Sequence, residues 1–143
     1  MSDLRSFIFL DQLQPQTLAY VASWMRGVLP RRNMAAQIIE VAPGLDIEGL
    51  TDVALKGANV SVGLLVVERQ FGYLEFHSSA TAEVKVGAQA VLDAIGAREE
   101  DASAPQILGS KVVTRVDHQH AFLINRNKLG SMILGGDSLY LLE

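Results

Sequence analysis

The sequence predicts an α/β (α+β) sandwich of ferredoxin-like type, in which helices pack on an antiparallel sheet. Apolar runs of strand length alternate with segments whose apolar residues recur at helical spacing. Two of the runs are joined by a tight connection and are followed by a helix, which is the order typical of such a sandwich. The composition is globular, with 49% hydrophobic and 20% charged residues, and 143 residues suffice for one domain with an ordinary core.

The N-terminal part predicts a strand, a helix and a second strand. We expect these elements at Arg5–Leu10, Thr17–Arg26 and Met34–Val41, with the last strand buried. Gly27, Pro30 and Asn33 mark the break between the helix and the second strand. The residues expected to share the apolar face of the helix are Leu18, Val21, Ala22 and Met25.

The middle of the chain predicts a helix at Leu45–Gly57 and then two strands. The first strand, Val60–Glu68, is apolar and continuous enough to be covered on both faces. A tight connection at Arg69–Gly72 leads to Tyr73–His77, whose alternation is typical of a half-exposed strand. The residues expected to face inward from the helix are Ile47, Leu50, Val53 and Ala54.

A further helix is predicted at Ala80–Ala97, where Ser78 or Ser79 can cap the start by accepting a backbone N–H hydrogen bond. Its inward residues are expected to be Val84, Ala88, Val91, Leu92 and Ile95. The acidic stretch after it, AREEDASAP, ends in Pro105 and predicts a linker. We therefore expect a first domain over residues 4–97, a linker over 98–105 and a C-terminal segment over 106–143.

The C-terminal segment repeats the pattern of the N-terminal part. It predicts a strand at Lys111–Asp117, a short helix at His120–Lys128 and a closing strand at Ser138–Glu143. The glycines Gly27 and Gly130 lie 103 residues apart, as do the glutamates Glu40 and Glu143. The first copy continues into further strands and helices, whereas the second ends here. Either the chain holds one whole domain and the opening of another, or it holds one domain whose two edge strands complete a partner subunit. Both interpretations indicate a subunit of an assembly, and a chance similarity of strand–helix–strand stretches remains the alternative.

The composition argues against several classes of protein. A net charge of −4 and a pI near 5.3 disfavour nucleic-acid binding, and the one basic pair, Arg31–Arg32, is expected to be a solvated turn. The absence of cysteine excludes disulfides, a thiolate nucleophile and Cys-ligated zinc, in keeping with a cytoplasmic protein. The N-terminus lacks a signal-peptide pattern, and no apolar stretch is long enough to span a membrane.

Residues Met34–Ala97 resemble the bacterial microcompartment (BMC) shell domain. The strand AAQIIEV is followed by PGLDIEGLTDVALKGANV, which is similar to that family's first helix with its Asp-x-x-x-Lys ending. The next stretch, SVGLLVVERQFGYLEFHSSATAEVKVGAQAVLDAIG, resembles the two inner strands, the pore loop and the second helix.

The flanking sequences resemble the circularly permuted branch of the family. In that branch the last strand and short helix are moved to the front, and FIFLDQLQPQTLAYVAS resembles the moved segment. The tail KVVTRVDHQHAFLINRNKLGSMILGGDSLYLLE then resembles the front of a second permuted domain. The resemblance implies the N-terminal part of a tandem, trimer-forming (BMC-T type) protein, which forms pseudo-hexamers. Alternatively, the tail packs on the first domain and single domains form a hexamer.

The resemblance places Glu68, Arg69, Gln70, Phe71 and Gly72 in the loop that lines the central pore. In a ring of identical subunits, each residue of one loop is repeated around the axis. Glu and Arg side chains could then meet in a closed pore or separate and present charge to polar metabolites. The alternative is an ordinary hairpin with a weak surface Glu–Arg pair.

The resemblance also places Lys56 at the edge of the tile, where two helices from neighbouring rings meet and a long aliphatic stem can lie flat. Asp52 lies four residues earlier on the same helix face. The alternative is a solvated Asp–Lys pair with no role in assembly.

Other candidate sites are weak. His118 and His120 would share one face of a strand beside Asp117, but a third zinc ligand is lacking, so we expect a loop or cap there and no metal. His77 beside Glu75 is expected on an exposed strand face. Phosphate-binding loops and the common hydrolase and metalloprotease motifs are absent, and no base partner is predicted for Ser79 or Ser110. We therefore expect no catalytic residue and no cofactor.

The sequence thus predicts a structural shell subunit and not an enzyme. Its expected partners are copies of itself, other shell proteins and the encapsulated enzymes, in a compartment of the cytoplasm, without nucleic acid or membrane. Two alternatives remain: a ferredoxin-like oligomeric regulator that binds a small metabolite, and a small enzyme that uses Glu75, His77 or Asp117–His118.

Overall fold

The structure is a computed structural model that describes residues 2–127 and 132–143. The chain divides into two compact units, Met1–Ala104 and Pro105–Glu143. Lys128 and Gly130, which belong to the expected C-terminal helix and its following turn, lie outside the described residues.

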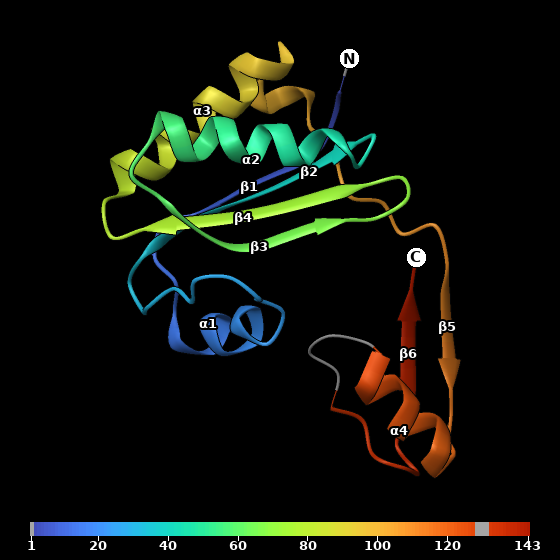
Figure 1. Cartoon of the computed structure of the whole chain (residues 1–143). Coiled ribbons are helices and arrows are strands. Elements are labelled where there is room, and N and C mark those ends of the chain that lie inside the picture. The colour runs from blue at the N-terminus through green and yellow to red at the C-terminus, as the bar shows by residue number, and fades with distance from the viewer. Residues whose placement is uncertain (1, 128–131) are drawn as a thin grey trace. The chain divides into compact units, whose positions relative to one another are not determined.

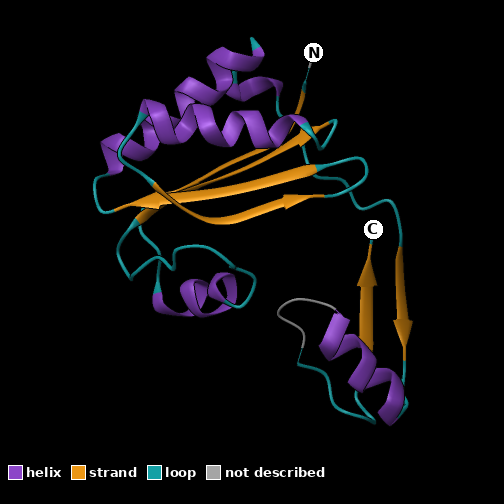
Figure 2. Ribbon diagram, in the orientation of Figure 1, coloured by secondary structure: helices purple, strands orange, loops and turns teal. Residues whose placement is uncertain are grey.

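The first unit is built on a four-stranded antiparallel sheet whose strand order is β1-β2-β4-β3. Helices α2 and α3 lie on one face of this sheet and α1 on the other, so that the strands form the middle layer (Figures 1 and 2). The predicted mixed α/β class with an antiparallel sheet is therefore confirmed. The elements are β1 (Asp3–Leu10), α1 (Pro15–Ala22), β2 (Ala35–Ala42), α2 (Asp46–Gly57), β3 (Ser61–Val67), β4 (Gly72–Ser78) and α3 (Thr81–Ile95).

The core lies between the sheet and the α2–α3 layer. All five inward residues predicted for α3 are buried, and so are Ile47, Leu50 and Ala54 of α2, while Val53 is half-buried. From the strands, Ile39, Leu74 and Phe76 complete this core with no exposed surface. The helical periodicity in the sequence thus identified the packed faces of both helices correctly.

The expected exposures of β3 and β4 are wrong: the strand expected to be covered on both faces is partly exposed, and the strand expected to be half-exposed is buried. The apolar strand β3 lies at an edge of the sheet, with Leu65 and Val67 exposed. The alternating strand β4 lies between β2 and β3, and its residues from Leu74 to His77 are all buried. Alternation predicts a solvated face only when nothing packs there, and here α1 and its connections lie on the face of the sheet opposite α2 and α3 (Figure 1).

Helix α1 is shorter than predicted, and none of its residues is buried. Met25, expected on its apolar face, lies beyond the helix and is buried there. After the helix the backbone runs beside β3: the N–H groups of Arg26 and Gly27 donate to Gly63 O at 3.0 and 2.9 Å, and that of Val28 donates to Val62 O at 2.9 Å. The backbone after the helix is thus hydrogen-bonded to the edge strand β3.

The start of α3 also differs from the prediction. The residue at the N-cap is Ala80, and neither Ser78 nor Ser79 caps the helix with its side chain. Ser78 Oγ instead accepts a hydrogen bond from the N–H of Ala80 at 3.2 Å, and this bond closes a local turn before the helix. The helix ends at Gly96, whose φ of 68° is the left-handed conformation typical of a helix end.

The acidic stretch after α3 contains a short 3-10 helix, Glu99–Asp101. The Arg98 N–H donates to Asp101 Oδ2 at 2.7 Å, and the Ser103 N–H donates to the main-chain oxygen of Arg5 at 3.1 Å. The stretch is therefore held against the outer edge of β1.

The second unit contains β5 (Ser110–Val113), α4 (His118–Asn127) and β6 (Leu139–Leu142). Strands β5 and β6 pair antiparallel, and each is shorter than its predicted counterpart. Helix α4 begins two residues earlier than predicted because Asp117 caps it: Asp117 Oδ1 accepts the N–H of Gln119 at 2.8 Å.

The pairing of β5 with β6 reproduces that of β1 with β2 at an offset of 103 residues. Leu10 pairs with Ala36, and Val113 pairs with Leu139. The same offset relates the other three residue pairs of the β5–β6 ladder to pairs in the β1–β2 ladder.

The turns at the ends of the helices match as well. Leu13 N–H donates to Met34 O at 2.9 Å, and its counterpart Val116 N–H donates to Asp137 O at 2.9 Å. Both Leu13 and Val116 are buried, with 1% and 2% of their surface exposed.

The two units also share an unusual backbone conformation before the second strand. Asn33 has a φ of 66°, and Gly136, which is 103 residues later, has a φ of 92°. Each donates its N–H to the buried residue of the preceding turn, Leu13 and Val116 respectively. Asn and Gly are the residues that adopt left-handed conformations most readily, so the two turns meet one requirement with different side chains.

Candidate functional site

The loop from Glu68 to Gly72 joins β3 to β4 and closes as a tight hairpin. The Glu68 N–H donates to Phe71 O at 2.8 Å. Glu68, Arg69 and Gln70 are exposed, Phe71 is half-buried and Gly72 is buried. The loop therefore presents one carboxylate, one guanidinium and one amide to solvent from a hydrogen-bonded base.

The base of this loop packs directly on the start of α2. A β-carbon on Gly72 would collide with Gly44 O and with the side chain of Ile47. A β-carbon on Gly44 would collide with the main-chain oxygens of Phe71 and Glu68. The loop backbone and the turn before α2 are thus in contact at a distance that only glycine permits.

The residues beneath the loop form a small charged cluster on the face of the sheet opposite α2 and α3. The register places Ser6 opposite Glu40 and Glu40 opposite Tyr73. Burial raises the pKa of the Tyr73 phenol, and the negative charges of Glu40 and Glu68 raise it further, while the positive charge of Arg5 lowers it. The Arg5 guanidinium lies over the Phe71 ring, 5.3 Å from its centroid.

The surface Glu–Arg pair that the sequence allowed is not formed within the subunit. In the described part of the chain, no ion pair joins Glu68 to Arg69.

Asp52 and Lys56 lie together on the exposed face of α2. Lys56 Nζ donates to Asp52 Oδ2 at 2.5 Å, with 76% of the lysine side chain and 59% of the aspartate side chain exposed. The pair is the i, i+4 contact expected of a solvated helix, and its exposure leaves the lysine stem accessible to a neighbour.

Glu75 and His77 are buried, which corrects the expectation of an exposed strand face. They retain 1% and 2% exposure, and His77 Nδ1 lies 3.0 Å from Glu75 Oε1. Glu75 Oε2 also accepts the N–H of Gly63 at 3.1 Å. The pair joins β4 to β3 inside the fold, and it is closed to a substrate as the structure stands.

His118 and His120 lie in the first turn of α4 and not on a strand, so they do not share one face. The neighbouring Asp117 is occupied as the cap of this helix. Within residues 2–127 and 132–143, no group of three or more His, Cys, Asp or Glu side chains is arranged to hold a metal ion.

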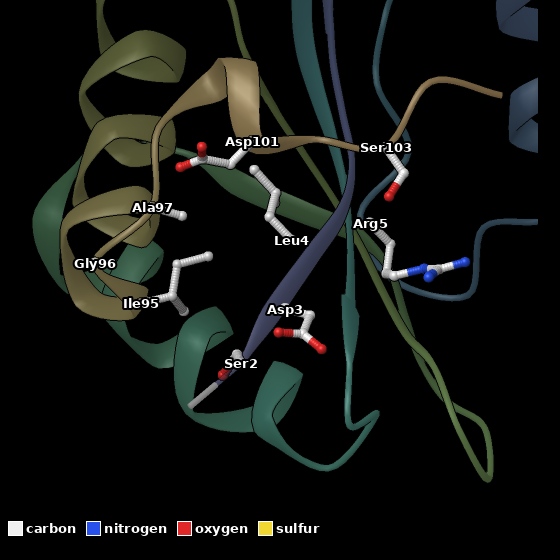
Figure 3. Close-up of a pocket in the computed structure, with 9 residues that line it drawn as sticks. All are labelled: Ser2, Asp3, Leu4, Arg5, Ile95, Gly96, Ala97, Asp101 and Ser103. Carbon is white, nitrogen blue, oxygen red and sulfur yellow. The ribbon is translucent and has the colours of Figure 1, made fainter.

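A shallow cavity of about 390 Å³ lies at the outer edge of β1. It is bordered by residues 2–5 and by the end of α3 and the following stretch (Figure 3).

Among the described residues, no helix is long and apolar enough to cross a membrane.

Sequence reasoning missed Arg5 and Tyr73, which the structure brings beside the loop. The sequence predicts only that Arg5 begins one strand and that Tyr73 begins another, and it assigns no function to either residue. Neither residue carries a motif, and the strand order that brings them to Phe71 and Glu68 is not visible in local periodicity.

The comparisons with known proteins agree on one family. A model of the CsoS1D N-terminal domain matches residues 4–101. The carboxysome shell protein CcmP of Synechococcus elongatus is 40% identical over 141 residues, which are 99% of this chain and 66% of that protein.

Two solved structures are also similar. The fused permuted hexameric shell protein MSM0275 from the RMM microcompartment is 64% identical, with a TM-score of 0.75, over 98% of this chain and 69% of that one. The double ringed trimeric shell protein MSM0271 from the same microcompartment is 38% identical, with a TM-score of 0.76, over 99% of this chain and 68% of that one. The chain thus spans about two thirds of the length of these relatives. These matches show that the chain belongs to the CsoS1D family of microcompartment shell proteins.

Proposed function

We propose that this chain is a structural subunit of a bacterial microcompartment shell in the cytoplasm, and that it assembles into cyclic trimers or hexamers that tile edge to edge. The observation that carries the proposal is the 64% identity, over 98% of the chain, to a protein described as a fused permuted hexameric shell protein. The relatives are named as shell proteins, which agrees with the expectation that the chain is not an enzyme.

In this assembly, the loop Glu68–Gly72 would line a central pore through which polar metabolites pass. The proposal is supported by the three exposed polar residues at its tip and by the close packing of its base on Gly44. A rotation axis would gather several copies of Glu68 and Arg69 around one opening. Because neither side chain forms an ion pair within the described residues, both would be available to pair between subunits.

The edge of the tile would be formed by Asp52 and Lys56. Both are well exposed on α2, and the aliphatic stem of Lys56 offers apolar area that a neighbouring helix could cover. Further partners would be other shell proteins and the enzymes that the shell encloses.

The segment 106–143 would be the opening of a second BMC domain. The support is the offset of 103 residues that relates β5, α4 and β6 to β1, α1 and β2, down to single hydrogen bonds. In the first unit β2 has a neighbour on each side, β1 and β4, whereas its counterpart β6 pairs only with β5 in the described residues. A strand equivalent to β4 would therefore pair with the other side of β6.

Light scattering after gel filtration, followed by electron microscopy of the same fractions, tests the assembly. A trimer or hexamer that forms rings and then sheets is the expected result. A stable monomer at micromolar concentration would contradict the pore and the tile edge together. A trimer that forms no sheets but retains a small metabolite through dialysis would favour the ferredoxin-like regulator.

A further inference from the structure

We propose that Arg5 is the positioning residue of the loop Glu68–Gly72. From strand β1 it holds Phe71, and with it the base of the loop, in one conformation. The inference rests on the proposed pore function for its consequence in the shell, but its first test does not require a pore.

Arg5 lies at a bulge in β1. Leu4 pairs with Val41 and Ser6 with Glu40, so Arg5 is an extra residue without a partner on β2. Such a bulge redirects a side chain and increases the local twist. In Figure 3, Leu4 lies on the side of the strand that faces the end of α3, and Arg5 points to the other side.

The bulge is held from outside by the stretch that follows α3. The Ser103 N–H donates to the main-chain oxygen of Arg5 at 3.1 Å. This bond ties the bulge to the stretch that follows α3. The orientation of Arg5 is therefore determined by the fold and not by its own side chain alone.

The guanidinium of Arg5 reaches across β2 to the loop. Its Cζ atom lies 5.3 Å from the centroid of the Phe71 ring, which is a cation–π distance. Among the described residues, no ion pair or side-chain hydrogen bond holds Glu68, Arg69 or Gln70. The stacking on Phe71 is thus a side-chain contact that ties the loop to an element other than its own hairpin.

Arg5 also balances the charge beneath the loop. Glu40 and Glu68 both act on Tyr73 as negative neighbours, and Arg5 acts on it as a positive one. Removing Arg5 would therefore free the Phe71 ring and leave the two carboxylates without this counter-charge at the base of the loop.

Hydrogen exchange in the Arg5→Ala variant tests the positioning role. The matched control is Lys85→Ala, because Lys85 Nζ also lies 5.3 Å from a ring centroid, that of Phe9 on the same strand. We expect the Glu68 amide, which is bonded to Phe71 O, to exchange about two- to five-fold faster in Arg5→Ala, the range that an exposed cation–π contact supplies. Arg5→Lys should restore part of the protection, and Lys85→Ala should leave the Glu68 amide unchanged.

An unchanged Glu68 amide in Arg5→Ala would overturn the proposal. A loss of protection that is equal along the whole of β4 would also overturn it, since that indicates general destabilisation.

As an independent readout, the absorbance of Tyr73 can be titrated in a Tyr20→Phe/Tyr140→Phe background. The pKa of Tyr73 should rise when Arg5 is removed and stay unchanged in Lys85→Ala, and an unchanged pKa in both would count against the proposal.

Conductance of assembled rings in a planar bilayer then separates this inference from the proposed pore. If the wild type conducts, Arg5→Ala should change its open-state noise or conductance while Lys85→Ala does not. If the wild type does not conduct, the proposed pore function is wrong. The hydrogen-exchange experiment then still decides whether Arg5 positions the loop.

Discussion

Gly44 and Gly72 lie backbone to backbone, so that a β-carbon on Gly72 would collide with the main-chain oxygen of Gly44. Gly44 precedes α2, which carries Asp52 and Lys56, and Gly72 closes the loop that carries Glu68 and Arg69. One helix therefore links the proposed edge of the tile to the proposed pore. The contact depends on the small size of both residues, because neither has a positive φ.

Substituting either glycine by alanine should destabilise the first unit. Gly72→Ala forces the loop away from Gly44 and Ile47, and Gly44→Ala forces the turn before α2 away from Phe71 and Glu68. Overpacking of this kind costs about 1–3 kcal/mol in the free energy of unfolding. Urea unfolding measures the change.

The control for these variants is Gly49→Ala. Gly49 lies within α2, and a β-carbon there would meet nothing within 4 Å. Alanine should therefore raise the free energy of unfolding by up to about 1 kcal/mol, because it lowers the conformational entropy of the unfolded chain. Equal effects of Gly49→Ala and Gly72→Ala would show that the close contact with Gly44 is unimportant.

Replacing Lys56 by alanine should abolish tiling and leave the ring intact. The Asp52–Lys56 pair is exposed, so its loss should change the free energy of unfolding by less than about 0.5 kcal/mol. Electron microscopy should show isolated rings in place of sheets, and light scattering should give the wild-type ring mass. Asp52→Ala removes the ion pair but keeps the aliphatic stem of Lys56, so it separates the contribution of the pair from that of the stem. Sheets that form normally in Lys56→Ala would remove Lys56 from the edge.

Replacing Glu75 by alanine should destabilise the fold, because Glu75 accepts the Gly63 N–H and contacts His77 inside the protein. Leaving these buried groups without a partner costs about 1–3 kcal/mol in the free energy of unfolding. Glu75→Gln, which keeps an acceptor oxygen, should lose less. The matched control is Glu83→Ala, since Glu83 also accepts a backbone N–H, that of Asn59, but in an exposed position. A Glu75→Ala protein of unchanged stability that loses a measurable turnover would favour the enzyme alternative.

The stability of the protein should fall above pH 10 through Tyr73. The folded state holds the pKa of Tyr73 above its ordinary value of about 10, mainly through burial and then through Glu40 and Glu68. Between the unfolded and the folded pKa, the unfolded chain releases the phenol proton and the folded chain keeps it, so unfolding becomes more favourable as the pH rises. Below pH 10 this contribution is fully present.

Urea unfolding between pH 8 and pH 11 measures this effect as the difference between the wild type and Tyr73→Phe. The variant should lack the part of the decline that belongs to Tyr73, and Glu68→Gln should reduce it. Identical pH profiles for the wild type and Tyr73→Phe would show that the folded protein does not shift this group.

The sequence by itself determined the fold class, the packed faces of α2 and α3 and the family. These features are local or nearly so: the buried residues of α3, from Val84 to Ile95, recur at helical spacing, and the residues from Met34 to Ala97 resemble the BMC shell domain in order. The sequence also indicated the repeat at 103 residues, through its strand–helix–strand pattern and the pairs Gly27/Gly130 and Glu40/Glu143. The equivalence of Asn33 and Gly136 became visible only in the backbone conformation.

Only the tertiary structure decided which strands are central and which residues surround the loop. The strand order places the apolar β3 at an edge and the more polar β4 in the middle, which buries Glu75 and His77 as a pair. The same order and one bulge bring Arg5 to Phe71 across β2. Local periodicity records whether a side chain is apolar but not which segment far along the chain will cover it, and that pairing is what assembles the base of the loop.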